Sequence, residues 1–354
     1  MNTIRHKKIG LGSFFHEVNP ETLINYNIID KIPKYELFYT GRHAIKHLIE
    51  LIDKQQKIST IWLPNYYCQH VTNWLKTNFK NISFYSIDPF FEEKSFNIID
   101  FAKKDDVVIL NNFWGIFKYN IPTTKEKPIC IEDHSHGWLS DSCLNSQADY
   151  CFASLRKTLP IPLGGIAWSP KQNEISKNNS IIDKDPFYQI WNIIDNAMKL
   201  KADFITNSST DKNKYLSLIS KTEEALHNQH DVLKLKNEHK EYITTFLNKD
   251  YNFYKSKNLK YILEKIKPNK HFKLICNESN SSFGLHIIFK DRKKFEDFKL
   301  HLIKNIIYPS ELWPDNILNT EFKYMMNIHI DFRYDFKDMS HIANQINFWT
   351  INKK

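Results

Sequence analysis

The stretch Val107-Val108-Ile109-Leu110-Asn111-Asn112-Phe113-Trp114-Gly115 opens with four apolar residues in a row and then turns polar at two neighbouring amides. A strand that is apolar at every position is typical of a parallel sheet whose two faces are both covered, whereas a half-exposed strand alternates apolar and polar residues. Similar short runs occur at residues 60–63, 82–87 and 128–131. The stretch therefore predicts a core strand of a parallel sheet.

Helical patterns separate these runs. One spans Ala44–Ile52 and a second lies around Val71–Leu75, and each keeps its apolar residues on one face. Strands that alternate with helices from Tyr39 to Asp149 are typical of βαβ units, in which helices cover both faces of a parallel sheet. We therefore expect an α/β fold in which a large domain has a mostly parallel sheet flanked by helices.

The pattern changes after Trp168. Residues 169–185 are polar and loop-like, and Pro186–Lys249 has the pattern of long helices with a polar linker near residues 207–213. The rest of the chain mixes two predicted strands with two predicted helices, at 282–289, 328–332, 292–304 and 337–348. Such a mixture favours a smaller C-terminal α+β domain. The parts that we expect are an N-terminal arm (1–35), a large domain with its connecting helices (36–249) and a small domain (250–354).

The composition fits a folded globular protein, because 42% of the 354 residues are hydrophobic and 25% are charged. The net charge of +9 does not come from a basic patch. The densest N-terminal run is Arg5-His6-Lys7-Lys8, and the other lysines are spread among Asn, Ile and Asp along the chain. A nucleic-acid partner is therefore not expected, although the charge suits phosphorylated small molecules.

Cysteine usage and the lack of long apolar runs indicate the compartment. The five cysteines form no CxxC pair and no zinc-like spacing, which favours a reducing compartment. Met1–Phe15 lacks the apolar core of a signal peptide, and no run of eighteen apolar residues occurs. We expect a cytoplasmic protein with no membrane partner and no metal.

Polar residues that directly follow apolar strands are the candidates for a site, because ligands of open parallel sheets bind at the carboxyl ends of the strands. The first candidate is Glu132-Asp133-His134-Ser135-His136-Gly137, which follows the strand at 128–131. Asp133 could hold the protonated ring nitrogen of a pyridine cofactor. On this stretch alone, a cap of the next helix is the better interpretation, and metal ligation is weakly supported.

The second candidate is Asp149-Tyr150-Cys151-Phe152-Ala153-Ser154-Leu155-Arg156-Lys157, a mostly apolar strand that ends in Ser, Arg and Lys. A lysine at a buried strand exit beside Arg156 would have a lowered pKa, which makes its amine available for an imine. The turn at Gly164-Gly165 follows. We expect Lys157 to be a nucleophilic amine rather than a surface lysine.

Two weaker candidates remain. Tyr39-Thr40-Gly41-Arg42-His43-Ala44 is a glycine turn that opens a helix, and free N–H groups at a helix N-terminus suit a phosphate. One glycine before a helix is more often an ordinary turn. The amides and aromatic rings of Asn111–Gly115 could line a pocket, and simple packing explains them equally well.

Taken in order, five segments resemble the DegT/StrS-type pyridoxal phosphate (PLP) aminotransferases, which act mainly on sugars. They are Thr40-Gly41-Arg42-His43-Ala44, Leu63-Pro64-Asn65-Tyr66-Tyr67-Cys68, Asn112-Phe113-Trp114-Gly115, Glu132-Asp133-His134-Ser135-His136-Gly137 and Ser154-Leu155-Arg156-Lys157. Late in the chain, Ile307-Tyr308-Pro309, Leu312-Trp313-Pro314 and His329-Ile330-Asp331-Phe332-Arg333-Tyr334 resemble small-domain signatures of the same family. The resemblance covers roughly residues 36 to 348 and implies a fold-type-I PLP-dependent transferase.

The resemblance also implies roles for single residues. Lys157 matches the lysine that forms the Schiff base with PLP, and Asp133 matches the partner of the ring nitrogen. The other implied cofactor-binding residues are Gly41, Arg42, His43, Tyr67, Cys68, Asn112, His136 and Ser154. Of these, His136 would contact the phenolic oxygen, and Ser154 would bind the phosphate together with backbone amides of Arg42 and His43. The implied substrate-binding residues are His329, Arg333 and Tyr334, although Arg333 could equally form an ion pair with Asp331 or Asp335.

Three departures from the family concern the reaction more than the cofactor. The spacing S-x-x-K from Ser154 to Lys157 is shorter than the S-x-x-x-x-K of many sugar aminotransferases. Cys68, with Tyr67 beside it, stands where an aromatic ring often covers the cofactor. Arg42-His43 replaces small residues.

The leading functional hypothesis is amino transfer from an amino acid, with glutamate favoured, to a keto sugar linked to a nucleotide. The short S-x-x-K spacing motivates an alternative, a PLP lyase, decarboxylase or transferase that acts on an amino acid. A binding or scaffold protein without activity is disfavoured, because Asp133 and Lys157 are both present. A homodimer is expected by analogy with fold-type-I enzymes.

Overall fold

The computed structural model describes residues 10–12, 14–32, 34–91, 96–182, 185–207, 211–275, 283–316 and 318–353. The basic run Arg5–Lys8, Cys276 and the first residue of the strand predicted at 282–289 lie outside these ranges. None of the helices within them is long and apolar enough to cross a membrane. The four cysteines in these ranges, Cys68, Cys130, Cys143 and Cys151, are all free thiols.

The large sheet has seven strands in the described ranges, in the order β2-β8-β7-β6-β5-β3-β4. Its strands are β2 (Tyr35–Phe38), β3 (Ile61–Pro64), β4 (Ile82–Tyr85), β5 (Val107–Asn111), β6 (Ile129–Asp133), β7 (Tyr150–Ser154) and β8 (Gly165–Trp168). Strand β8 pairs antiparallel with β2 and β7, and the other pairs are parallel. All five residues of β5 are buried, which confirms the prediction from the apolar run.

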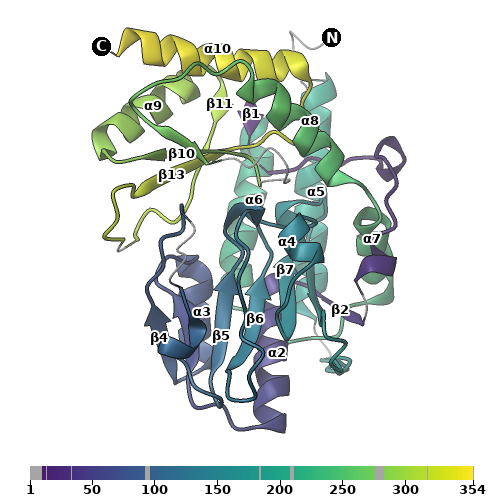
Figure 1. Ribbon diagram of the computed structural model, residues 1–354. Helices are drawn as coiled ribbons and strands as arrows, with labels where there is room; N and C mark the ends of the chain where they lie inside the picture. The colour runs from purple at the N-terminus through teal and green to yellow at the C-terminus, as the bar shows by residue number, and fades with distance from the viewer. Residues whose placement is uncertain are drawn as a thin grey trace.

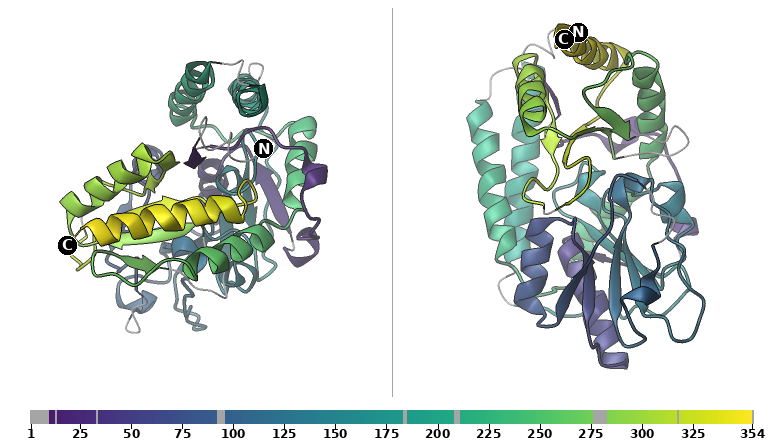
Figure 2. Two further views of the ribbon diagram at one scale, coloured as in Figure 1. Left: turned by 90° about the horizontal axis from the view of Figure 1, so that it is seen from above. Right: turned by 60° about the vertical axis from the view of Figure 1, so that its left-hand side comes forward.

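Helices cover the large sheet and connect it to the small domain (Figure 1). They are α2 (Gly41–Gln55), α3 (Gln69–Asn78), α4 (Asp141–Leu144), α5 (Pro186–Asn207), α6 (Lys212–His227) and α7 (Asn237–Leu247). The apolar face predicted for α2 is buried against β7 and β8. Figure 2 shows the long helices α5 and α6 side by side, reaching from the large sheet toward the small domain.

The small domain has a four-stranded antiparallel sheet in the order β12-β13-β10-β9. Its strands are β9 (Lys273–Ile275), β10 (Leu285–Phe289), β12 (Ser310–Glu311) and β13 (Tyr324–Ile328), and its helices are α8 (Tyr251–Leu263), α9 (Arg292–Lys304) and α10 (Phe336–Asn352). Figure 1 shows these helices packed around the small sheet, which lies above the large one. They share a hydrophobic cluster that is distinct from the core of the large sheet. The division into parts at residues 35 and 249 stays a prediction.

The N-terminal arm joins the small domain. Residues Leu11–Gly12 form β1, which pairs in parallel with β11 (Ile307–Tyr308). Gly12 has a φ of +109°, and a Cβ there would lie 2.2 Å from the carbonyl oxygen of Tyr308, so this close pairing requires glycine.

The strand predicted at 328–332 is wrong. Strand β13 ends at Ile328, where its pairing with β10 ends. Beyond that point the backbone carbonyls of Ile330 and Asp331 accept hydrogen bonds from the Asn258 side chain of α8. Hydrogen bonds from the Asn258 side chain therefore replace sheet pairing in this segment. Residue propensity cannot reveal a partner so far away along the chain.

Candidate active site

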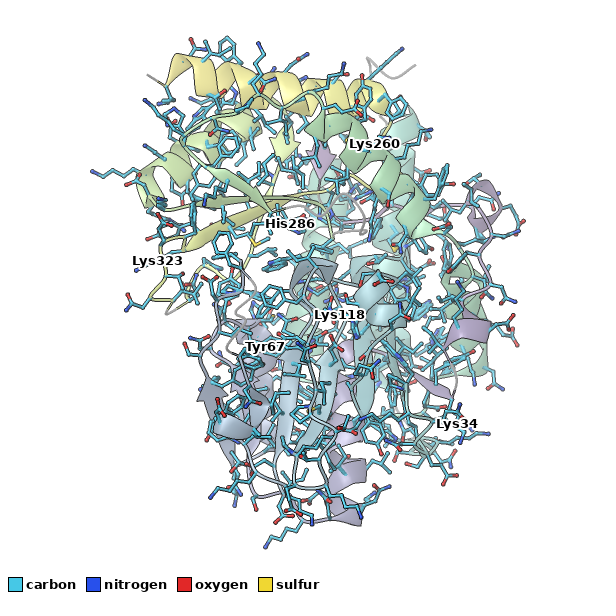
Figure 3. The ribbon with its side chains drawn as sticks, viewed as in Figure 1. Lys34, Tyr67, Lys118, Lys260, His286 and Lys323 are labelled. Atoms are coloured by element: carbon cyan, nitrogen blue, oxygen red, sulfur yellow. The ribbon has the colours of Figure 1, made fainter. Side chains whose placement is uncertain are left out.

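A cavity of about 710 Å³ opens at the carboxyl ends of the central parallel strands, where ligands of such sheets bind. The N-terminus of α2, the start of α3, the last turn of α6 and the ends of β5, β6 and β7 contribute to its wall. In Figure 3, Tyr67, one of the lining residues, lies at the upper end of the large sheet, beneath the small domain. The cavity brings together eight of the predicted site residues: Gly41, Arg42, Tyr67, Cys68, Asp133, His136, Ser154 and Lys157.

Asp133 is the last residue of β6 and is held by two donors. The hydroxyl of Tyr67 donates to Oδ2 at 2.6 Å, and the N–H of Ser135 donates to Oδ1 at 2.8 Å. Burial, and then the Asp133 carboxylate, raise the pKa of Tyr67 well above its usual range, so Tyr67 remains a protonated donor. Asp133 caps no helix, because the next helix, α4, is capped by Ser140. The carboxylate is thus fixed in orientation at the wall of the cavity.

Lys157 ends the 3-10 helix η5 (Leu155–Lys157), which follows β7 directly. Its Nζ lies 3.1 Å from Nε2 of His136. Burial, and then the nearby Lys157 cation, lower the pKa of His136 well below its usual range. A neutral imidazole can accept a hydrogen bond from the ammonium group of Lys157. The amine is therefore oriented by a neutral acceptor.

The environment of Lys157 differs from the expected one in two respects. The side chain is half-buried rather than buried, because the strand ends at Ser154 and η5 carries Lys157 to the edge of the cavity. The Arg156 guanidinium is paired with Glu223 of α6, so it is not an uncompensated cation beside the amine. Both differences follow from the turn after β7 and from a contact 67 residues along the chain.

Aromatic rings fix the His136 side chain on two sides. It stacks on Phe283 at 4.5 Å between ring centroids, on Trp114 at 5.4 Å and on Trp313 at 5.5 Å. Trp313 also lines the cavity. Trp114 and Phe283 come from the large and small domains, so the contacts of His136 join the two. The ring can rotate little inside this cage.

Gly41 and Ser154 bring α2 and β7 into close contact beside the cavity. A Cβ at Gly41 would lie 2.9 Å from Cβ of Ser154 and 3.1 Å from its backbone nitrogen, so only glycine allows this approach. Thr40 caps α2 by accepting the N–H of His43 at 3.3 Å. The N–H of His43 is therefore already used, and Gly41 and Arg42 are the better candidates for a phosphate.

The side chain of His43 lies outside the cavity. Its Nδ1 contacts the Thr40 hydroxyl at 2.7 Å, and its Nε2 lies 3.2 Å from the carbonyl oxygen of Gln229. Burial lowers the pKa of His43 to about 3. This neutral, buried ring connects α2 to the segment that directly follows α6.

Asn111 lines the cavity, whereas Asn112, which the sequence resemblance implies as a cofactor-binding residue, does not. The Nδ2 of Asn112 donates to the carbonyl oxygen of Phe117, to Glu132 and to Ser142, so this residue points away from the cavity. Asn111 lines the cavity, is 2% exposed, and its Nδ2 has no hydrogen-bond partner in the described ranges. Asn111 pairs with Asp133 across β5 and β6. Alternation along β5 relative to Asp133 is the signal that could have distinguished the two amides.

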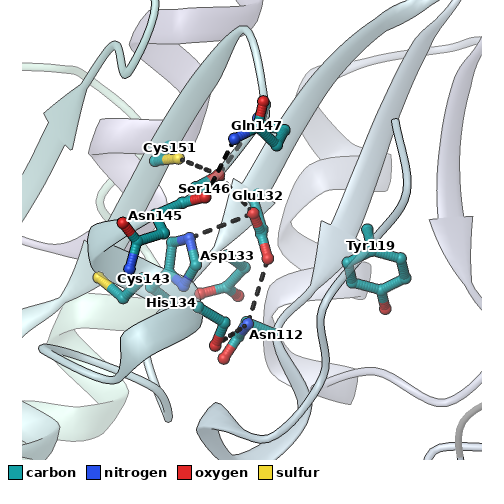
Figure 4. A network of polar contacts seen from close by, with 12 residues as sticks. Asn112, Tyr119, Glu132, Asp133, His134, Cys143, Asn145, Ser146, Gln147 and Cys151 are labelled. Atoms are coloured by element: carbon teal, nitrogen blue, oxygen red, sulfur yellow. Dashed lines mark hydrogen bonds and ion pairs between the residues drawn. The ribbon is translucent and has the colours of Figure 1, made fainter. Parts of the chain in front are cut away.

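A buried polar network lies behind Asp133 (Figure 4). The Glu132 carboxylate contacts Nε2 of His134 at 3.4 Å and accepts from the Ser146 hydroxyl at 2.5 Å and from Asn112 at 3.1 Å. Glu132, His134 and Cys151 bring ligand-type atoms within 4.8 Å of one another. The Ser146 hydroxyl, however, already bridges the thiol of Cys151 and Glu132. We interpret this group as an internal network that supports the end of β6.

The predicted substrate-binding residues Arg333, Tyr334 and His329 do not line the cavity. The Nε and Nη2 of Arg333 donate to the two carboxylate oxygens of Asp331 at 2.8 and 2.7 Å, as in the ion pair considered from the sequence. The Tyr334 hydroxyl bonds to the backbone of Gly12, and His329 lies 3.8 Å from Asp331. Their role in substrate binding stays a prediction.

Glu223 is a lining residue that the sequence does not reveal. It reaches the cavity from α6, far from every motif, and its partner Arg156 is recognised only once the helices are packed. No spacing or strand exit marks it, so only the tertiary structure could have found it.

Comparison with known proteins supports the fold. No family model and no curated protein matches the chain. Among solved structures, protein AtS13 of Actinomadura melliaura is 13% identical with a TM-score of 0.60, and the match covers 96% of this chain and 99% of that protein. The sugar aminotransferase CalS13 of Micromonospora echinospora is 12% identical with a TM-score of 0.61 and the same coverage.

A third similar structure is the PLP form of a protein of Streptococcus pneumoniae that has been assigned as a sugar aminotransferase. It is 10% identical with a TM-score of 0.57, and the match covers 97% of this chain and 99% of that protein. At such identities the likeness establishes the fold. The chain therefore has the fold-type-I architecture, a mostly parallel sheet with a smaller α+β domain, that its sequence resemblance predicts.

Proposed function

We propose that this protein is a PLP-dependent aminotransferase that moves an amino group from an amino acid, with glutamate as the donor, to a nucleotide-linked keto sugar. The observation that carries the proposal is that the Lys157 amine and the fixed Asp133 carboxylate line one cavity at the carboxyl ends of β6 and β7. Similar sugar aminotransferases share this fold. Surface polysaccharide or related biosynthesis is the setting that such a product suits.

The residues of the cavity fit PLP. Asn111 presents a buried amide without a partner, which is costly unless a ligand accepts from it. The close approach of Gly41 to Ser154 leaves a narrow cradle at the N-terminus of α2, where a phosphate is stabilised. Asp133 would hold the ring nitrogen, and Lys157 would hold the aldehyde carbon. When bound, PLP supplies an electron sink for the electrons released at the substrate carbon.

The side chains around this cofactor have separable tasks. Lys157 would accept and return the proton at the substrate carbon that carries the amino group, since its Nζ is the only lysine nitrogen that lines the cavity in the described ranges. Neutral His136 orients that nitrogen by accepting a hydrogen bond from it. Tyr67 keeps Asp133 in place and keeps its charge available to the ring nitrogen.

Charge supports the choice of acceptor. Arg42, Arg156 and Lys157 line the cavity together with Asp133, Glu223 and Glu224, and the chain carries a net charge of +9. A nucleotide-linked sugar brings a diphosphate, which a chain of net positive charge attracts. By analogy with the fold, we expect a cytoplasmic homodimer.

The test is the absorbance spectrum of the purified PLP-loaded protein during titration with glutamate. The expected result is replacement of the visible band of bound PLP by the spectrum of the pyridoxamine form, followed by recovery when an accepted nucleotide keto sugar is added. If glutamate leaves the spectrum unchanged while another amino acid is consumed, the alternative applies, a PLP lyase, decarboxylase or transferase. The S-x-x-K spacing from Ser154 to Lys157 is the feature that keeps this alternative open.

A further inference from the structure

Two arginines and the Glu223 carboxylate share one side of the cavity, and the neighbouring Glu224 also lines it without pairing with either guanidinium in the described ranges. Arg156, from η5, donates through Nη2 to Oε2 of Glu223 at 3.0 Å, and its Nη1 contacts Oε1. Arg42, from the first turn of α2, lines the same cavity. Within the described ranges, the Arg42 guanidinium makes no hydrogen bond and no ion pair. One carboxylate thus faces two guanidinium groups.

The charges in this group are unevenly matched. Burial, followed by repulsion from Arg156, lowers the pKa of Arg42, which is the expected effect on a cation without a partner. Burial alone would raise the pKa of Glu223, but attraction by Arg156, and more weakly by Arg42 and Lys157, lowers it to about 2. Glu223 is therefore an anion at neutral pH. The group retains surplus positive charge.

The Glu223 side chain can leave while its helix stays in place. The side chain is 47% exposed, and that of Arg156 is 29% exposed. At this accessibility solvent and dissolved anions reach the pair, so an anion can compete for the Arg156 guanidinium. The helix itself is anchored, because Thr222 and Leu226 on either side of Glu223 are almost fully buried. Replacing Glu223 at Arg156 requires only a side-chain rotation.

We propose that Arg156 and Arg42 form an anion-binding subsite at the edge of the cavity, and that Glu223 is its internal counter-ion, which an anionic group of the substrate displaces. The inference rests on the proposed function, since that function supplies a substrate with a diphosphate. It deepens that function by naming the residues that bind the charged group and the residue that competes with it.

A diphosphate suits this subsite better than a carboxylate does. Guanidinium groups bind phosphates and carboxylates alike through paired hydrogen bonds. A substrate carboxylate would merely exchange with Glu223 and would leave Arg42 without a partner. A diphosphate carries at least two negative charges and can pair with both Arg42 and Arg156. Displacement is then favourable even though one ion pair is lost.

The experiment measures UDP binding to the PLP-loaded protein by isothermal titration calorimetry at low and moderate salt. Glu223→Gln removes the competing charge and keeps the size of the side chain, so UDP should bind about tenfold more tightly. Arg156→Gln should weaken binding by about tenfold or more, and Arg156→Lys should weaken it less, because one charge without the paired geometry remains. Thermal melting of each variant checks that it is folded.

Two controls separate this subsite from general charge effects and from the cofactor phosphate. Glu241→Gln removes the same charge from an exposed residue of α7 that does not line the cavity, and it should change UDP affinity by less than about twofold. PLP affinity, measured by fluorescence titration of the apoprotein, should be the same in Arg156→Gln as in the unmodified protein. An equal loss of PLP affinity would overturn the proposal, because the arginines would then serve the cofactor phosphate.

Unchanged or weaker UDP binding in Glu223→Gln would also overturn the proposal, as would absence of UDP binding in every form of the protein. Failure of the proposed function looks different. In that case glutamate would not change the spectrum of the unmodified protein, whatever the effect of Glu223→Gln on UDP. Conversely, if the protein reacts with glutamate but Glu223→Gln does not increase its UDP affinity, the proposed function stands and the proposed subsite is contradicted.

Discussion

Asp133 and Asp331 each lie at or just beyond the end of a strand, one in each domain, and both are almost fully buried. Asp133 accepts from Tyr67 and Ser135 at the wall of a cavity. Asp331 is saturated by the Arg333 guanidinium, and this pair lies outside that cavity. The buried carboxylate that neutral donors hold faces the cavity, whereas the one that an internal cation holds does not.

Among the residues that line the cavity with Asp133, replacement of Lys157 should have the largest effect on the rate of the reaction with glutamate. Lys157→Ala should slow the reaction with glutamate by on the order of 10³-fold or more, because the variant lacks the amine that we propose both to bind PLP and to move the proton. Stopped-flow absorbance measures this rate. A rate within tenfold of the unmodified protein would show that the chemistry lies elsewhere.

Substitution of the two aspartates should separate activity from stability. Asp133→Asn should lower the rate with glutamate by about 10²- to 10³-fold, because the charge beside the ring nitrogen is lost while the shape is kept. Asp331→Asn should instead lower the free energy of unfolding by about 3 to 5 kcal/mol, because the buried Arg333 guanidinium would lose its carboxylate counter-ion.

Urea unfolding and the glutamate rate, measured on both aspartate variants, check this separation. We expect Asp133→Asn to lower the rate more than the stability, and Asp331→Asn to lower the stability more than the rate. If Asp331→Asn impaired the rate in a fully stable protein, the Asp331–Arg333 pair would have a direct role in substrate binding.

Acid should destabilise the fold through buried neutral histidines. Burial lowers the pKa of His329 to about 4 and that of His286 to about 3. The unfolded chain binds protons at these rings below about pH 6.5, whereas the folded chain does not, so the free energy of unfolding falls as the pH decreases from about 6.5 to 4. Each ring contributes up to about 1.4 kcal/mol per pH unit.

Urea unfolding at a series of pH values tests this slope. His329→Asn should reduce it, because one of the groups that take up protons on unfolding is removed. Stability that is unchanged between pH 6.5 and 4 would contradict the assignment of these rings as neutral.

The smallest effects should distinguish the two neighbouring amides. Asn111→Ala should weaken PLP binding by about threefold to tenfold with little change in stability, since its Nδ2 has no partner in the described ranges. Asn112→Ala should cost about 2 kcal/mol of stability, because it removes hydrogen bonds to Phe117, Glu132 and Ser142. PLP titration and urea unfolding of both variants provide the test, and equal effects on PLP would contradict it.

Much of the fold was predictable because its signals are local. The apolar run at Val107 predicted the buried strand β5, and the helix predicted at Arg292–Lys304 has the bounds of α9. The strand predicted at 328–332 failed because its carbonyl groups bond to Asn258, which lies more than 70 residues away. Hydrogen bonding between distant residues leaves no local pattern.

The candidate site was predictable to the same extent. Asp133, His136, Ser154 and Lys157 were predicted because they follow apolar strands and occur in the order of the family motifs. All four line one cavity. The difference between Asn111 and Asn112 depends on the register of β5 against β6, and Glu223 depends on the packing of α6. The sequence therefore predicted residues that follow strands, but it did not predict single residues whose position depends on tertiary contacts.

Borohydride reduction of the PLP-loaded protein, followed by peptide mass spectrometry, tests whether Lys157 holds the cofactor. We expect a reduced PLP adduct on the peptide that contains Lys157, and loss of that adduct when the protein is first incubated with glutamate. An adduct on another lysine, or no adduct in a protein saturated with PLP, would contradict the claim that Lys157 holds the cofactor.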